Sequence, residues 1–260
     1  MIRHTIIAAA LVFLIGPPLA AQDETIPPVP PQRSRAARIG AFGGVTPGWL
    51  FLDVKPFNEF LEPAGAAPLA DDGVVLWGGA GAAYIMFVPN LRVGGMGMGG
   101  SLRSTALDAE GVRRDAELGV GFGGVTVEYV VPILERLDVA FGAMLGGGGV
   151  DLTLRQDVGG AKTWDREKRY FTTGDYRDNA GTGQIGSISR KLSGAFFVWV
   201  PSVHVEYGFL GWVGARLGVS YVGMTAPSWS LDDRYDLLGV PSGVHGRGVM
   251  VNAGLFLGTF

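Results

Sequence analysis

Three side chains at alternate positions of one apolar run, Ser202, His204 and Glu206, carry the groups of a nucleophilic catalyst. A hydroxyl, an imidazole and a carboxylate in hydrogen-bonding contact could attack a carbonyl carbon, with the imidazole as general base. Successive positions on one face of a strand, however, lie roughly 7 Å apart, which is longer than the hydrogen bond that a nucleophile and its base require. We therefore expect no catalysis from this group.

Charged side chains recur inside other apolar runs of the chain. Glu128 lies in VTVEYVV and Glu206 in VHVEYGF, at matching places. A charge inside a dry interior must be paired, so we predict a buried ion-pair layer, with Arg216 as the candidate partner of Glu206. The alternative for the same residues is a path for protons or ions. The residues that strand alternation assigns to this inward-facing layer are Arg92, Glu128, Asp138, His204, Glu206 and Arg216.

These side chains lie in segments of roughly ten or more residues with strand-like alternation, which is long enough for a tilted strand to cross a membrane. Short connections follow the second, fourth and sixth segments, at residues 89–90, 132–136 and 208–211, and the other connections are longer. Short periplasmic turns and longer extracellular loops are typical of bacterial outer-membrane barrels. We predict an all-β fold, an eight-stranded antiparallel transmembrane β-barrel over residues 39–260. Its strands are expected at 39–52, 74–88, 91–104, 116–131, 137–154, 195–207, 212–224 and 248–260.

The composition and the start of the chain agree with export to a membrane. Glycine accounts for 43 of 260 residues, 47% of the residues are hydrophobic and 17% are charged. Residues 1–21 have the charged start, apolar centre and small-residue end of a signal peptide, and residues 22–38 are expected to form a Pro-rich periplasmic leader. The absence of cysteine excludes disulfides and thiolate metal sites, and the net charge of -3 gives no reason to expect nucleic acid. A soluble secreted β-sandwich is the alternative fold.

Alternation also assigns the faces of most strands. In the run 125–131 the odd-numbered side chains are expected to face lipid and Glu128 the interior. The second strand does not sort cleanly, and neither does the last, because placing Phe256 and Phe260 outward puts Leu255 and Leu257 inside. An eight-stranded barrel is just filled by side chains or holds one small ligand, so no wide pore is expected.

The signal peptide, the eight alternating segments, the short turns and the closing GLFLGTF together resemble the small eight-stranded outer-membrane proteins of Gram-negative bacteria, of OmpA/OmpX-like architecture. The resemblance implies residence in the outer membrane, in contact with its lipid and lipopolysaccharide. It also implies that the barrel-assembly machinery reads Phe260, although Gly258 stands where another large residue is common. Outer-membrane lipid A deacylases are similar in placing Ser, His and an acid on a small barrel, so a lipid-modifying enzyme remains a second alternative.

Two of the long connections carry aromatic residues. In residues 53–73, Phe57, Phe60 and Leu61 have helical spacing and predict a short amphipathic helix at the barrel mouth. The connection over residues 155–194 mixes charges with aromatic residues, which predicts a contact surface for an extracellular protein, a ligand or lipopolysaccharide, or simply a solvated loop. The aromatic contact candidates are Trp164, Tyr170, Phe171 and Tyr176.

No cofactor and no metal are expected: the fragment that starts at Asp175 has Arg177 where a calcium loop needs an oxygen ligand and Ala180 where it needs glycine. We therefore expect a non-enzymatic outer-membrane barrel with a structural or surface-interaction role. The first alternative is a narrow channel or transporter for small solutes.

Overall fold

The computed structural model describes residues 40–109, 111–159, 162–174, 187–241 and 243–258. The expected signal peptide and leader, Tyr176 and Phe260 lie outside these residues. The described elements are β1 (Ala41–Val45), β2 (Gly48–Leu52), α1 (Lys55–Leu61), β3 (Val74–Tyr84), β4 (Leu91–Leu107), β5 (Arg113–Pro132), β6 (Leu137–Asp157), α2 (Trp164–Thr173), β7 (Ile188–Gly208), β8 (Val213–Met224), β9 (Ser228–Leu231), β10 (Tyr235–Asp236) and β11 (Gly248–Gly258).

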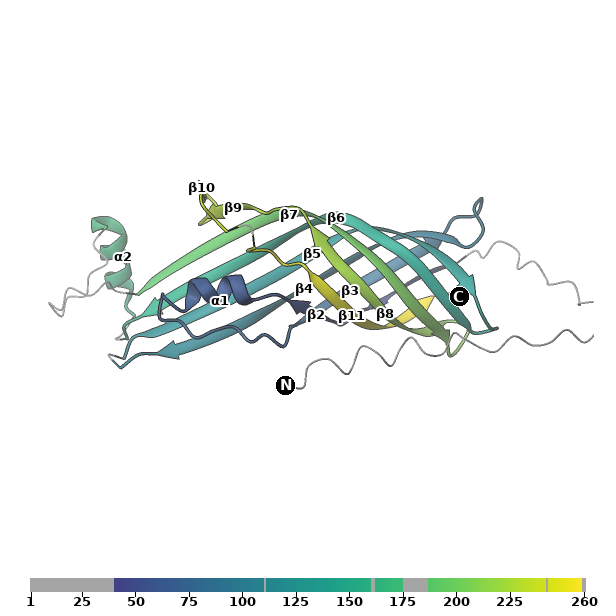
Figure 1. The fold of residues 1–260 in the computed structure, drawn as a ribbon, viewed down its shortest axis with the longest axis horizontal. Helices are drawn as coiled ribbons and strands as arrows, with labels where there is room; N and C mark the ends of the chain where they lie inside the picture. Colours follow the sequence, from purple (N-terminus) through teal and green to yellow (C-terminus); the bar gives the residue numbers. More distant parts are fainter. Residues whose placement is uncertain (1–39, 110, 160–161, 175–186, 242, 259–260) are drawn as a thin grey trace, which may run out of the picture. The chain divides into compact units, whose positions relative to one another are not determined.

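The strands close into an antiparallel barrel, which confirms the predicted fold class (Figure 1). Consecutive strands pair from β3 up to β8, which is the last strand of this series. β8 then pairs with β11, and β11 pairs with both β1 and β2. Because β1 and β2 also pair with β3, they act as one interrupted strand and complete a ring of 8 strands. The prediction of one continuous strand over residues 39–52 is wrong at Thr46 and Pro47, where proline has no N–H for a strand ladder.

The outer surface of the barrel carries an apolar band. Side chains such as Val127, Leu145 and Val205 are exposed on it, and their neighbours in sequence point inward. Aromatic side chains lie exposed at both margins of the band: Tyr129, Tyr207 and Trp212 near the short turns, and Trp49, Trp77 and Trp199 towards the long connections. An apolar band with aromatic margins is the surface that transmembrane barrels present to lipid.

Strands β4 to β7 continue beyond this band, and there their outer surface is charged. Arg103 Nη2 lies 2.8 Å from Glu117 Oε1, and Arg155 Nη1 lies 3.5 Å from Glu117 Oε2. Lys191 Nζ lies 3.6 Å from Asp151 Oδ1 on the adjacent strand. The long connection predicted over residues 105–115 is therefore mostly strand, because the ladder of β4 and β5 extends to Leu107 and Arg113.

The mouth of the barrel at the long connections is partly covered by α1, the helix that the aromatic spacing predicts (Figure 1). Phe57 and Leu61 are buried on its inner side, while Phe60 is exposed. The side chain of Asn58 fixes the helix by accepting a hydrogen bond from the Leu69 amide at 2.7 Å and donating one to the Leu69 carbonyl at 3.0 Å. Neither α1 nor α2 is long and apolar enough to cross a membrane.

The faces of the two unsorted strands are now clear. In β3, Val74 and Leu76 are buried inside while Trp77 is exposed outside. In β11, Phe256 is buried and its neighbours on both sides are exposed, which assigns the faces that the sequence left open. The ring of Phe256 packs edge-on against Phe42, with centroids 5.1 Å apart, so the barrel interior holds an aromatic pair.

Candidate functional site

A compact layer of four charged side chains lies inside the barrel near the short turns. Arg92 comes from β4, Glu128 from β5, Glu206 from β7 and Arg216 from β8. Arg92 is directly opposite Glu128 in the strand register, and Glu206 is opposite Arg216. All four are buried, with 1% of Arg92 and 8% of Glu206 exposed. The two positive charges balance the two negative ones, which allows the layer to be buried.

The four residues also bond across the interior, from one pair of strands to the other. Arg92 Nε donates to Glu128 Oε2 at 2.6 Å, while Arg92 Nη1 donates to Glu206 Oε2 at 2.8 Å. Arg92 Nη2 also donates to Glu206, and Arg216 Nη2 donates to Glu128. Arg216 Nε lies 3.2 Å from Glu206 Oε1. Each arginine therefore contacts carboxylates on both walls, so the four residues, which we call the charge layer, form a closed ring across the barrel.

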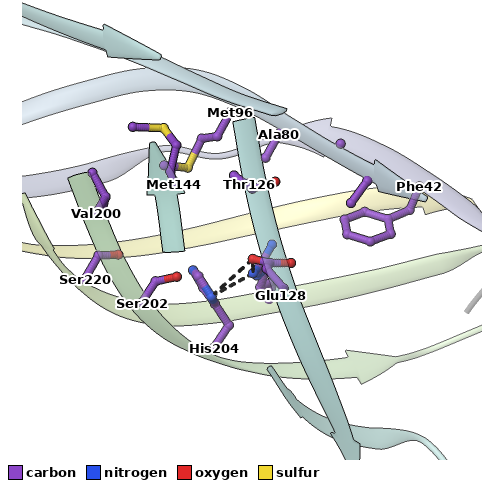
Figure 2. A pocket seen from close by; sticks show the side chains of 13 residues that line it. Phe42, Ala80, Met96, Thr126, Glu128, Met144, Val200, Ser202, His204 and Ser220 are labelled. Atoms are coloured by element: carbon purple, nitrogen blue, oxygen red, sulfur yellow. Dashed lines mark hydrogen bonds and ion pairs between the residues drawn. The ribbon is translucent and has the colours of Figure 1, made fainter. Parts of the chain in front are cut away.

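His204 belongs to this arrangement rather than to a catalytic triad. Its Nδ1 lies 2.7 Å from Arg216 Nη2 and 3.8 Å from Glu128 Oε1, and Figure 2 shows the ring turned towards Glu128. Since a guanidinium can only donate, Nδ1 is the acceptor of this hydrogen bond. Ser202 Oγ lies 3.5 Å from the Gly142 carbonyl, and in the part of the chain that the structure describes it forms no hydrogen bond with His204. The nucleophile and base of a triad are thus not brought together.

Two aromatic rings that sequence reasoning missed cover the charge layer. The guanidinium of Arg92 lies 4.7 Å from the ring centroid of Phe42, and that of Arg216 lies 5.9 Å from that of Phe256. Cation–π contacts of this kind stabilise a desolvated guanidinium. Alternation places Phe42 on an inner face, but its contact with an arginine depends on barrel closure and cannot be read from the sequence.

Asp138, the sixth predicted member, lies at the mouth of the barrel on the short-turn side. It is opposite Glu206 in the register of β6 and β7 and is buried. With Glu206 and the turn 208–211 it lines a depression of about 390 Å³ that opens at this mouth. The structure therefore places Asp138 beside the charge layer and between the layer and the solvent.

Above the charge layer the interior is filled except for a cavity of about 20 Å³ that the layer itself borders (Figure 2). Its polar lining comes from Glu128, Arg216 and His204 and from the hydroxyl groups of Thr126, Ser202 and Ser220. That volume has room for about one water molecule. Beyond it, a continuous cluster of buried apolar side chains extends from Met144 and Val200 to Leu61 of α1.

The predicted contact residues of the connection over residues 155–194 divide into two groups. Trp164 and Phe171, seven positions apart on one side of α2, are 84% and 90% exposed. Tyr170 is 4% exposed, so its side chain does not share the exposed surface of Trp164 and Phe171. The sequence did not predict α2 itself, whose charged and aromatic residues resemble those of a solvated loop.

A second hollow, which the sequence did not predict, lies at the mouth covered by α1. Its volume is about 340 Å³. We call it the outer pocket; its lining residues are Pro56, Phe57, Phe60, Leu152, Leu192, Trp229, Leu237, Leu238, Gly239, Val240, Pro241 and Val244. Across the described ranges, no cluster of three or more His, Asp or Glu side chains is arranged to hold a metal ion.

Comparison with known proteins gives similarity to solved structures alone. No protein-family model matches the chain, and no curated protein sequence matches it. The attachment invasion locus protein Ail of Yersinia pestis, in complex with the heparin analogue sucrose octasulfate, is 12% identical, with 85% of this chain and 95% of that chain covered and a TM-score of 0.32. The outer membrane protease OmpT of Escherichia coli is 12% identical, with 87% and 98% covered and a TM-score of 0.33. The barrel architecture rests on the strand pairing described above.

Proposed function

We propose that this chain is a closed, non-conducting β-barrel of the outer membrane that presents a binding surface outside the cell. The apolar band supports membrane insertion, and the contrast between short turns and long connections supports an orientation with the turns in the periplasm. In this proposal residues 1–21 are the export signal, residues 22–38 the periplasmic leader and Phe260 the assembly signal.

The charge layer is the observation that carries the closed-barrel proposal. Its ring of ion pairs joins opposite walls of the interior, so an ion that passed would have to separate Arg92 from Glu206 or Arg216 from Glu128. Above the layer, the same ion would meet a cluster of apolar side chains. Transfer of an unpaired charge into such surroundings is strongly unfavourable. A narrow channel requires a polar route, and this arrangement opposes one.

Planar-bilayer recordings test this proposal. The purified protein is expected to give no steady single-channel conductance, while its insertion is verified independently by heat-dependent migration on a gel. A double variant, Arg92→Ala with Arg216→Ala, removes both bridging guanidinium groups and leaves the apolar cluster above the layer unchanged, so any conductance of this variant measures how much of the closure is due to the layer. A steady conductance of the unmodified protein that Glu206→Gln abolishes would contradict closure and establish an ion path through the charge layer.

We also propose that Ser202, His204 and Glu206 have no catalytic role. Support comes from the geometry: His204 Nδ1 is bonded to Arg216, and the Ser202 hydroxyl is directed to a backbone carbonyl. Mass spectrometry of lipid A from cells that produce the protein checks this. Loss of an acyl chain with the unmodified protein, but not with Ser202→Ala, would show that the barrel is a lipid-modifying enzyme.

The binding role is proposed for the extracellular elements. Trp164 and Phe171 expose two large rings on one side of α2, and aromatic residues of this kind are frequent anchors in protein interfaces. The ion-paired outer surface above the apolar band, with Arg103 and Arg155, is the part that would contact lipopolysaccharide. Binding of cells or extracellular proteins to the purified protein, compared with a Trp164→Ser, Phe171→Ser variant, measures the contribution of α2.

A further inference from the structure

The outer pocket is bordered by α1, by strands of the barrel wall and by the segment from Leu237 to Val244. Phe57, Leu152 and Trp229 are buried and form its inner lining. Asn58 holds α1 in place through its two hydrogen bonds to Leu69. On the opposite side, the Leu237 amide donates to the Trp229 carbonyl at 2.9 Å, which fixes the start of the segment that forms the other wall. Hydrogen bonds therefore hold both walls of the hollow, α1 and the start of the segment after Asp236.

The lining of the outer pocket is chemically uniform. Each of its twelve lining residues is Pro, Phe, Leu, Trp, Gly or Val, so the indole N–H of Trp229 is the one polar side-chain group of the lining. A charged or strongly hydrated ligand would lose its hydration there without enough compensating partners, which disfavours ions, sugars and nucleotides. The pocket thus selects for a neutral, apolar molecule.

The size of the pocket limits that molecule further. Ligand sites commonly have volumes of roughly 300–1,000 Å³ with a mostly apolar lining. An apolar cavity of about 150 Å³ accommodates benzene. The outer pocket, at about 340 Å³, has roughly twice the volume of that benzene-binding cavity. It therefore has room for a two-ring aromatic compound or for one hydrocarbon chain of about ten carbons.

The position of the pocket indicates the side from which a ligand enters. Leu152 and Leu192, which line the pocket, lie directly opposite each other in the register of β6 and β7. The next pair in that register, Thr153 and Lys191, points to the opposite face, which is the charged outer surface beyond the apolar band. The pocket therefore lies inside the part of the wall that extends out of the membrane. Its rim carries Leu238, which is 89% exposed and precedes Gly239 with φ +76°. Access is from the aqueous mouth, past an apolar side chain on a turn.

We propose that the outer pocket is a binding site for one neutral hydrocarbon group, either a free small apolar molecule or a single acyl chain of a lipid. This site goes beyond the closed-barrel function, and it does not depend on whether the interior conducts ions. A conductance result and a binding result can therefore fail separately.

Binding of the neutral fluorophore N-phenyl-1-naphthylamine to the full chain, held lipid-free in amphipol, tests the site. We expect saturable binding of one probe per chain. Val240→Trp fills the pocket from its outer wall, and a loss of about 60 Å² of buried apolar area predicts at least about a tenfold loss of affinity. Phe60→Ser, at the exposed rim on α1, is a milder variant expected to fold normally and to weaken binding several-fold.

Leu107→Trp is the matched control, because Leu107 is exposed at the end of β4 and does not line the pocket. It should bind the probe like the unmodified protein. Native mass spectrometry of protein extracted from the membrane separates the two sources of the ligand. One lipid retained per chain, and lost in Val240→Trp, indicates an acyl chain, whereas displacement of the probe by free decane without retained lipid indicates a small molecule. Probe affinity that is the same in the unmodified protein, Val240→Trp and Phe60→Ser, with no retained lipid, would overturn the proposal.

Discussion

Replacement of Glu206 by Gln is the sharpest test of the charge layer. The change keeps the shape of the side chain but removes one of two carboxylates that face two arginines. The layer would then hold one uncompensated positive charge in a buried position. Removal of one partner from a buried ion pair typically costs about 3–5 kcal/mol, and we expect Glu206→Gln to lower the free energy of unfolding by about that amount.

Glu117→Gln is the matched control for the same chemical change. Glu117 pairs with Arg103 and Arg155 on the outer surface beyond the apolar band, where both arginines are largely exposed. Exposed ion pairs contribute about 0.2–1 kcal/mol, so this variant should be nearly as stable as the unmodified protein. The contrast between the two variants isolates burial from the loss of a carboxylate.

The assay is urea unfolding of the protein in lipid vesicles, followed by the fluorescence of its 6 tryptophans. A double variant, Arg92→Met with Glu206→Gln, leaves Glu128 bonded to Arg216 and the layer neutral again. Its cost should fall short of the sum of the two single variants by about 0.5–3 kcal/mol, the range for contacting residues. Equal, small costs for Glu206→Gln and Glu117→Gln, together with additive costs in the double variant, would refute the charge layer as a coupled unit.

Three further changes test the surrounding structure. Gly218→Ala should destabilise the barrel and shift the His204 ring, since a Cβ there would lie 2.0 Å from His204 Cδ2; a thermal melt and the imidazole NMR signals check this. Asn58→Ala should leave the barrel intact but loosen α1, because both hydrogen bonds to Leu69 are lost, and hydrogen exchange of the α1 amides should accelerate. Hydrogen bonds from an amide and an arginine of β7 lower the pKa of Asp232, so docking of β9 on β7 is favoured above the ordinary aspartate pKa. Docking should weaken as pH falls below about 4, and exchange of the β9 amides should show this. Asp232→Asn should reduce the pH dependence, and the remainder comes from Asp233, whose pKa is lowered by Ser193 and Lys191 of β7.

The strands that the sequence predicted well are those whose two faces differ in polarity. In β5, Glu128 and Thr126 point inward while Val127 and Tyr129 point outward, so alternation alone assigns the faces. In β11 only Asn252 marks the inner face by its polarity, and hydrophobicity could not distinguish the buried Phe256 from its exposed neighbours. The register with β8, which depends on closure of the ring, brings Asn252 to Ser220 and so fixes the face.

The candidate sites divide in a similar way. The members of the charge layer could be predicted because each lies at an inward position of a strand, but the bond between Arg92 and Glu206 joins residues 114 positions apart and requires the closed barrel. The outer pocket could not be predicted from the sequence, because its lining comes from α1, from three strands and from a connection without periodicity. Apolar residues in a loop, such as Leu238 and Val240, are a weak signal until the wall opposite them is known.

The charge layer also explains how a barrel whose membrane-spanning wall carries many apolar side chains on both faces keeps a unique strand register. A shift of one residue between neighbouring strands moves every side chain to the opposite face. In β7 such a shift would exchange Val203 and Val205 on the outside with apolar or small residues such as Val200 on the inside, at little cost in hydrophobic burial. The same shift would place Glu206 against lipid and leave Arg92 without its carboxylate, which is far more costly. Four charges near one end of the interior therefore fix the register for the whole wall, and this leaves the other end free to carry an apolar lining around the outer pocket.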